Sequence, residues 1–327
     1  MSYIKKTILI ALFAVLAFTS LGTVTYAWLS VGVTNTVENM DIGLLGEDSL
    51  EISLDGMNYY KTLTNEMLME QIKTVEWISV TSNDNENFYG VRGDVAKRNG
   101  DYVDITLWFK TAVKSHTNVY LVDNDKDAEF GNIGEVTGVT SRGVSWTSSH
   151  TFLNGPGDTM YAGETRMFYG ANALRIGFKE ELVEGIGFET VNDNRIDSEL
   201  NRRIIDPSED PSRGFGLPFG QYSYFNLTNP PGKPLPPEEE FPDTKYSFTK
   251  FYVNPLGNPS PNALDNNTEV GTFQKSAYAG IGGGQIKYVK VRLQIWFEGY
   301  DVDAFDSIRS DTVQIKLRFR SGIASYN

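Results

Sequence analysis

The sequence predicts an all-β protein, an antiparallel β-sandwich or jelly roll. The clearest signal is the alternation of apolar and polar residues in residues 288–297 and 313–319, which is typical of strands with one buried and one wet face. Convincing helical periodicity is confined to two short segments. The 31 glycines are scattered over 327 residues, as expected where turns separate many short strands.

Shorter runs of β-favouring residues predict the remaining strands. In chain order, the expected strands are residues 50–54, 76–80, 101–110, 118–122, 166–169, 174–178, 246–252, 288–297 and 313–319. Residues 101–110 and 118–122 are expected to pair with each other, and residues 65–73 and 197–204 to be short helices. Trp296 has the opposite parity to Ile295 and Phe297, so we expect it to face outward or into a second layer.

The first 27 residues are expected to form a hydrophobic export helix. Two lysines precede eleven unbroken apolar residues at 8–18, and smaller polar residues follow. Thr25 and Ala27 are small enough for the −3 and −1 positions of a signal-peptidase site, with Trp28 after the cut. An uncleaved membrane anchor is the alternative, because the uncharged stretch is long enough to span a bilayer. Before cleavage the chain would contact the membrane only through this signal segment. After cleavage it would be secreted.

The rest of the chain divides by composition. We expect residues 28–45 to be an N-terminal strand segment and residues 46–327 to form one sandwich domain. Nine of the 13 prolines lie between residues 230 and 261, which predicts a long extended insertion at about 205–265. A hinge between two domains is the alternative interpretation of this insertion.

Charge and missing residue types exclude several functions. The formal net charge is −13, from 29 basic and 42 acidic residues, which argues against general nucleic-acid binding. Cysteine is absent, so thiolate catalysis, disulfides and cysteine-ligated metals are excluded. The two histidines are 34 positions apart, and neither HExxH nor GxSxG occurs. The sequence therefore predicts a protein that is not an enzyme and has no cofactor.

Two acidic clusters are candidate calcium sites. Asp123, Asp125 and Asp127 alternate just after a predicted strand, where carboxylates can converge on a hard cation. The EF-hand pattern fails there, because alanine and glycine stand at its sixth and twelfth positions. A second cluster lies between the two best strands and consists of Glu298, Asp301, Asp303 and Asp306. For both clusters the residues favour a charged turn over a calcium site.

The segment after the expected cleavage site has one apolar edge. Its alternate apolar positions are Leu29, Val31, Val33 and Val37, and it carries no charge. Such a strand can pair with a sheet edge in its own domain or in a neighbouring molecule. In the second case backbone hydrogen bonds supply affinity, and a head-to-tail contact produces filaments.

Both ends of the chain resemble one family of exported proteins. The N-terminal residues and the strand end near the C-terminus resemble TasA/camelysin-like proteins of Gram-positive bacteria, which are processed by the SipW type of signal peptidase. The resemblance lies in TVTYAW at 23–28, NTV at 35–37, IGLL at 42–45, LEISLDG at 50–56 and QIWFEGYDVD at 294–303. It implies a jelly roll that polymerises into extracellular or matrix fibres, in which the mature N-terminal segment completes the sheet of the next subunit.

We therefore expect a secreted subunit of a cell-surface or biofilm-matrix fibre. Its partners would be further copies of itself and other matrix or cell-surface proteins. The alternative is a monomeric secreted module that binds carbohydrate or a surface through exposed aromatic side chains. The side chains considered for this role are Trp77, Trp108, Trp146 and Trp296, together with the 17 tyrosines.

Overall fold

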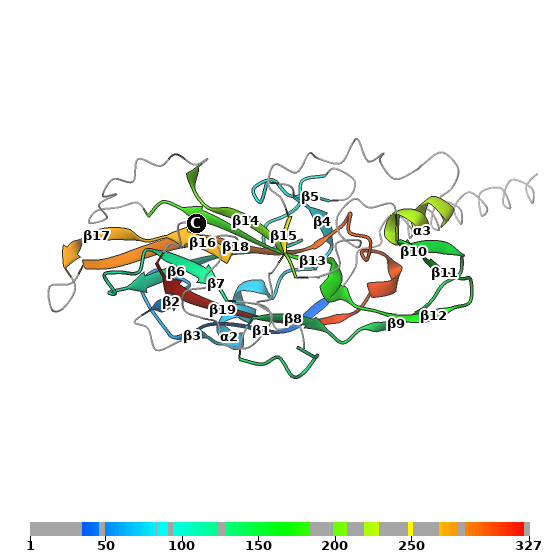
Figure 1. Cartoon of the computed structure of the whole chain (residues 1–327), viewed down its shortest axis with the longest axis horizontal. Helices are drawn as coiled ribbons and strands as arrows, with labels where there is room; N and C mark the ends of the chain where they lie inside the picture. Colours follow the sequence, from blue (N-terminus) through cyan, green and yellow to red (C-terminus); the bar gives the residue numbers. More distant parts are fainter. Residues whose placement is uncertain are drawn as a thin grey trace, which may run out of the picture.

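Two sheets of unequal size form the body of the protein (Figure 1). The described part of the chain is mostly β structure, which confirms the all-β prediction. No helix within it is long and apolar enough to cross a membrane. The expected export helix lies outside the described residues. The computed structural model describes residues 35–45, 50–82, 84–90, 94–122, 128–135, 137–183, 196, 199–207, 219–228, 248–250, 268–279 and 285–323.

The smaller sheet joins the first described strand to the last. Its strands are β1 (Thr36–Leu44), β3 (Thr62–Leu63), β7 (Asn118–Leu121), β8 (Gly138–Ser141), β16 (Glu269–Thr272) and β19 (Thr312–Gly322). They lie in the order β16–β7–β19–β1–β3, and β8 also pairs with β19. β1 runs parallel to β19, with Thr36 opposite Thr312 and Leu44 opposite Phe319. Nearly the whole chain connects these two strands, which leaves ample length for the crossover that a parallel pair needs.

The larger sheet is built around one long strand, β18. Its strands are β2 (Glu51–Ser53), β4 (Ser79–Thr81), β5 (Tyr89–Gly90), β6 (Val103–Thr111), β13 (Leu174–Glu181), β14 (Arg202–Asp206), β15 (Phe248–Lys250), β17 (Gln274–Ala279) and β18 (Gln285–Glu298). β18 pairs antiparallel with β13, β6 and β17, and parallel with β4. β14 and β15 form the other parallel pair.

The inner faces of the two sheets share one hydrophobic core. The ring of Phe319 on β19 lies 5.0 Å from that of Phe109 on β6 and 5.8 Å from that of Phe178 on β13. The alternation predicted for β18 and β19 is confirmed on this face, because the apolar positions of both strands are buried. Burial of these alternating side chains is the main stabilising contribution of a sandwich core.

A second layer covers part of the outer face of the larger sheet. Trp296 is fully buried there against Phe88, with ring centroids 5.1 Å apart, and Phe88 stacks on Tyr102 at 4.0 Å. Phe88 lies in the connection between β4 and β5, and Tyr102 directly precedes β6. Trp296 therefore faces a second layer, one of the two outcomes expected from its parity. The expectation of a wet outer face fails for the last part of β18, where Gln294 and Glu298 are also buried.

Two ribbons and a helix extend one end of the molecule (Figure 1). The ribbons are β9 (Val144–Thr147) with β12 (Thr165–Phe168), and β10 (Phe152–Gly155) with β11 (Asp158–Met160). Helix α3 (Gln221–Thr228) packs on β10, and the 3₁₀ turns η1 (Gly170–Ala173) and η6 (Asp306–Ile308) lead back to the sheets. We call the two ribbons and α3 the end module.

The other helix, α2 (Asn65–Ile72), confirms the helix predicted at 65–73. It begins at Thr64, whose hydroxyl accepts a hydrogen bond from the Met67 backbone N–H. Its buried residues are Leu68 and Ile72, which pack in the shared core.

Several local predictions are wrong. The sheets are mixed rather than antiparallel, and β6 and β7, expected to pair with each other, lie in different sheets. The helix expected at 197–204 is replaced by β14, whose pairing with β13 overrides a weak helical pattern. Trp77 has a left-handed backbone (φ 52°), so the strand expected at 76–80 is reduced to β4. Of the strand expected at 246–252, the structure describes residues 248–250, which form β15 in agreement with the prediction.

Candidate functional site

The first described residues of β1 are anchored beside the end module. The Thr36 backbone N–H donates to the Asp311 carbonyl (3.1 Å), and the Asp311 N–H donates to Asn35 Oδ1 (3.1 Å). The Asp311 carboxylate is buried and accepts hydrogen bonds from the backbone N–H groups of Gly143 (2.9 Å) and Gly170 (2.7 Å). Asp311 thus joins the β8–β9 connection and η1 through its carboxylate, and the start of β1 through its backbone. We call this set of five residues the root of the N-terminal strand.

The root fixes where the predicted assembly strand enters the fold. Val37 lies in β1, is 3% exposed and stands opposite Val313 of its own chain. On the side of β1 away from β19, β3 pairs only with Ile42 and Gly43. The Met40 N–H on this strand donates to Asn65 Oδ1 (2.9 Å). The described residues supply no strand partner along the first part of this side, and a strand edge of that kind can accept another strand.

An aromatic cluster builds the end module. The ring of Trp146 contacts those of Phe152, Phe168, Tyr224 and Phe305, with centroids 5.3–6.2 Å apart and interplanar angles of 71–89°. This edge-to-face arrangement is favourable for aromatic pairs. Trp146 is half-buried and packs in this cluster.

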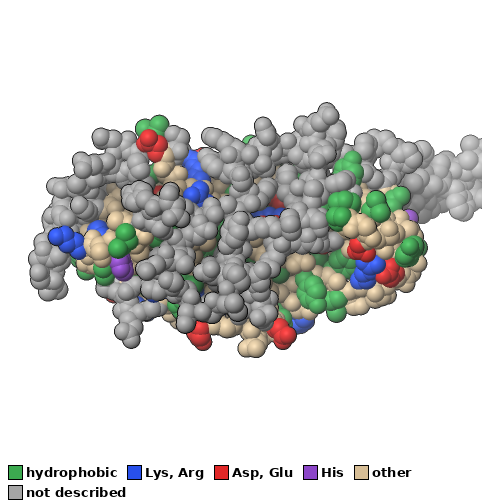
Figure 2. Space-filling model, in the orientation of Figure 1, with side chains coloured by type: hydrophobic (Ala, Val, Ile, Leu, Met, Phe, Trp, Pro, Cys, Tyr) green, Lys and Arg blue, Asp and Glu red, His purple; other side chains and the backbone are tan. Residues whose placement is uncertain are grey.

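Apolar side chains also gather on the surface of this module. Among the described residues, five of the eleven exposed large hydrophobic side chains lie here: Leu153, Tyr161, Met167, Tyr169 and Leu227. Figure 2 shows hydrophobic atoms at this end around a spot where acidic and basic side chains meet. Exposed apolar side chains are thus more frequent at this end than elsewhere on the described residues.

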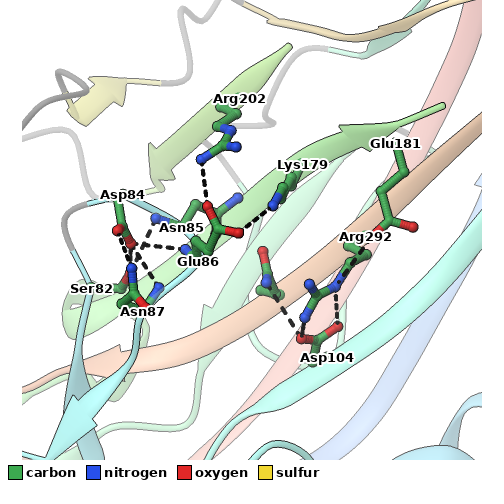
Figure 3. Close-up of polar contacts among 11 residues, drawn as sticks. Ser82, Asp84, Asn85, Glu86, Asn87, Asp104, Lys179, Glu181, Arg202 and Arg292 are labelled. Atoms are coloured by element: carbon green, nitrogen blue, oxygen red, sulfur yellow. Dashed lines mark hydrogen bonds and ion pairs between the residues drawn. The ribbon is translucent and has the colours of Figure 1, made fainter. Parts of the chain in front are cut away.

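A polar network covers the outer face of the larger sheet (Figure 3). Arg202, Lys179 and Arg292 stand side by side on β14, β13 and β18. Glu86 lies between the first two, 2.8 Å from Lys179 Nζ and 2.9 Å from Arg202 Nη1. Asp104 is fully buried at its side chain and pairs with Arg292. Three adjacent cations on neighbouring strands would repel one another without these carboxylates.

A tight turn delivers Glu86 to this network. Ser82 and Asp84 fix the turn, because the Asn85 N–H donates to Ser82 Oγ (3.1 Å) and the Asn87 N–H to Asp84 Oδ1 (2.8 Å). Asn85 is left-handed (φ 55°) and fully buried over Gly177, where an added Cβ would lie 1.9 Å from Asn85 Oδ1. Only glycine at this position allows the turn to approach the sheet so closely.

The same turn occurs earlier in the chain, at Ser53, Asp55 and Asn58. There the Gly56 N–H donates to Ser53 Oγ (2.9 Å) and the Asn58 N–H to Asp55 Oδ1 (2.8 Å). The shared spacing is Ser-x-Asp-x-x-Asn, which our sequence analysis missed. This spacing is the signal in the sequence that locates the turn carrying Glu86.

The network is arranged for ion pairing. The pKa of Glu86 is lowered, chiefly by the hydrogen bond from Lys179 and also by Arg202, so its carboxylate stays ionised between two cations. Glu86 is held by Lys179 and Arg202, and Asp104 is held by Arg292.

The second acidic cluster predicted from sequence is buried around an arginine. Arg175 and Asp301 are fully buried and ion-paired, and Asp206 Oδ2 lies 3.1 Å from Arg175 Nη2. Glu298 accepts a hydrogen bond from the Trp296 indole (3.0 Å). This cluster is therefore not an exposed charged turn. Among the described residues, no three acidic or histidine side chains are grouped so as to hold a metal ion.

Burial makes this cluster sensitive to pH. It raises the pKa of Glu298, and it raises that of Asp301 well above the ordinary value, with Asp303 and Asp206 adding repulsion against the pull of Arg175. Between their ordinary and their raised pKa values, these two groups hold more protons in the folded chain than in the unfolded one. Their contribution to stability is therefore lost as pH rises through the folded pKa values. We expect a higher urea midpoint near pH 5 than near pH 8.

The matched variant for this pH effect is Glu298→Gln, which removes one of the titrating groups. Its urea midpoint should change less between about pH 5 and pH 8 than that of the parent. An equal midpoint for the parent at the two pH values would contradict the raised pKa values.

The structure does not describe the remaining sequence-predicted site residues. Thr25, Ala27, Trp28, Leu29, Val31, Val33, Asp123, Asp125 and Asp127 lie outside the described residues. His150 Nδ1 lies 2.7 Å from Ser149 Oγ, but no carboxylate among the described residues hydrogen-bonds this exposed histidine. A serine–histidine pair without an orienting acid does not form a catalytic triad.

The described part of the chain thus offers an anchored N-terminal strand, an apolar end and compensated ion pairs. Comparison with protein-family models, curated proteins and solved structures gives no match. The resemblance to TasA/camelysin-like proteins rests on the sequence motifs alone.

Proposed function

We propose that this chain is a secreted, non-enzymatic subunit of an extracellular or cell-surface fibre. The segment from Trp28 to residue 34 would leave the fold at the root and add as a strand to the next subunit. The proposal includes the finer fold expected from sequence, a jelly roll; the packing of two sheets around one core supports a sandwich of this kind, although the sheets contain parallel pairs.

The observation that carries the proposal is the anchoring of β1 at the root. Hydrogen bonds to Asp311 hold Asn35 and Thr36, so the apolar segment before them starts from a fixed point beside the end module. A donor strand needs such a fixed base, because ordering it against a partner costs less entropy when one end is already held. The net charge of −13 would keep unassembled chains apart in solution.

Two deletions test this function. Electron microscopy of the concentrated protein starting at Trp28 should show regular filaments. Deleting residues 28–34 should abolish the filaments and leave the urea midpoint unchanged, because the root and β1 remain. Deleting residues 28–37 should abolish filaments and also lower the midpoint, because it removes Asn35, Thr36 and the buried Val37.

Filaments that persist after deletion of residues 28–34 would reject strand addition by this segment. Uniform monomers from the undeleted protein would reject the fibre function itself and would favour the monomeric binding module. Because the two deletions differ in their effect on stability, loss of assembly is separated from loss of folding.

A further inference from the structure

A polar pocket opens in the end module, and none of its lining residues belongs to the root or to the outer-face network. It lies between β12 and the β10–β11 hairpin, has a volume of about 360 Å³, and has Asp303 among its lining residues. This volume is within the range of small-molecule sites, which runs from about 300 to 1,000 Å³. Tyr169 and Met167, 44% and 51% exposed, also line it.

One wall of the pocket is rigid. Both oxygens of Asp158 accept hydrogen bonds from Arg166 Nη1 (2.8 and 2.9 Å), and Glu164 accepts from Arg166 Nε (2.6 Å). Arg166 Nη2 also donates to the Thr159 carbonyl (3.0 Å), so the guanidinium is held from three sides. Asn154 Nδ2 donates to Asp158 Oδ2 (2.7 Å). These hydrogen bonds hold the carboxylate, guanidinium and carboxamide groups in place before a ligand binds. This lowers the entropy cost of binding.

The aromatic ring at the pocket is fixed as well. Tyr169 packs over Gly143, where an added Cβ would lie 2.8 Å from the ring, and Gly143 has a left-handed backbone (φ 84°). A larger residue at Gly143 would push the ring away. Tyr169 therefore presents a positioned, partly exposed aromatic surface beside the polar wall.

The charges of the residues around the pocket indicate which class of ligand it can bind. Arg166 is neutralised by Asp158 and Glu164, and Asp303 adds a further carboxylate, so the lining disfavours anions. Carboxylate, guanidinium and the half-buried carboxamide of Asn172 offer donors and acceptors together. Neighbouring hydroxyl groups of a sugar both donate and accept, whereas a cation would need acceptors alone.

We propose that this pocket binds a sugar unit of a neutral glycan, with the ring lying against Tyr169 and its hydroxyls hydrogen-bonded to the polar wall. The site stands on the pocket's own geometry and does not depend on fibre assembly. None of the four tryptophans considered from sequence lines this pocket, in which the exposed aromatic ring is that of Tyr169.

Isothermal titration calorimetry with laminarihexaose, cellohexaose and mannohexaose tests the proposal. At least one of these neutral hexasaccharides should bind saturably. Tyr169→Ala and Asn172→Ala should each weaken that binding by about tenfold or more, a loss of about 1.4 kcal/mol. Tyr161→Ala is the matched control, because Tyr161 is 63% exposed on the same module but does not line the pocket, and its affinity should be unchanged.

Three results would overturn the proposal: no saturable binding of any of the three probes, unchanged affinity in both pocket variants, or tighter binding of chitosan hexasaccharide or polygalacturonate. Thermal unfolding of each variant checks that its fold is intact. Should Tyr169→Ala unfold, Asn172→Ala decides the outcome alone.

Discussion

Replacing Arg175 with alanine is expected to lower the free energy of unfolding by about 3–5 kcal/mol, the cost of removing one partner from a buried ion pair. Arg175 is fully buried between Asp301 and Asp206, and its Nη1 also donates to the Leu174 carbonyl (2.9 Å). Without the guanidinium, these carboxylates would remain in the interior with no countercharge. Urea unfolding of the variant and the parent, followed by tryptophan fluorescence, measures the difference.

The control for this experiment is Arg142→Ala. Arg142 is 62% exposed at its side chain and lies 3.5 Å from Glu38, so its loss should cost less than about 1 kcal/mol. The deficit of Arg175→Ala should also shrink near pH 5, because the stranded carboxylates are then protonated more readily. A loss below about 1 kcal/mol in Arg175→Ala would show that the buried cluster does not depend on this cation.

The second large effect is expected from Trp296→Ala, at about 3–5 kcal/mol, the usual cost of truncating a buried tryptophan. Trp296 is fully buried, its ring contacts Phe88, and its indole N–H donates to Glu298 Oε2 (3.0 Å). Its loss would leave a cavity under the second layer and remove a hydrogen bond from a buried carboxylate. Chemical denaturation followed by circular dichroism measures this loss.

Trp108→Ala is the matched control, since Trp108 lies on the same face of the same sheet but is only half-buried. It should be clearly less destabilising than Trp296→Ala. Trp296→Phe should fall between the parent and Trp296→Ala, because phenylalanine keeps much of the packing but not the hydrogen bond. Equal losses in Trp108→Ala and Trp296→Ala would reject a structural second layer over Trp296.

Strand existence was largely predictable, whereas strand pairing was not. The period-two pattern located β18 and β19 and the buried face of each, because alternation is a local property of a pleated strand. The same pattern could not assign β6 and β7 to different sheets, because the partner of a strand depends on residues far away in the sequence. β14 was mistaken for a helix because a short segment with weak local preference follows its tertiary neighbours.

For the candidate sites, too, local sequence patterns were predictable and contacts between distant residues were not. The acidic residues after β18 were visible in the sequence as a cluster, but their burial around Arg175 was not, since Arg175 stands more than 100 positions earlier. The turn that carries Glu86 follows a spacing that occurs twice in the sequence. Its contact with Lys179 and Arg202 required the turn to fold over β13 and β14.

The sequence by itself determined the all-β class, the faces of the best strands, helix α2 and the absence of thiol chemistry. These follow from composition and from short-range periodicity, which act within a few residues. Only the tertiary structure decided which strands pair, that Trp296 and Glu298 are buried, and that Asp311 anchors the start of β1 beside the end module. The physical reason is that burial and ion pairing depend on what covers a side chain, and here the covering residues come from distant parts of the chain.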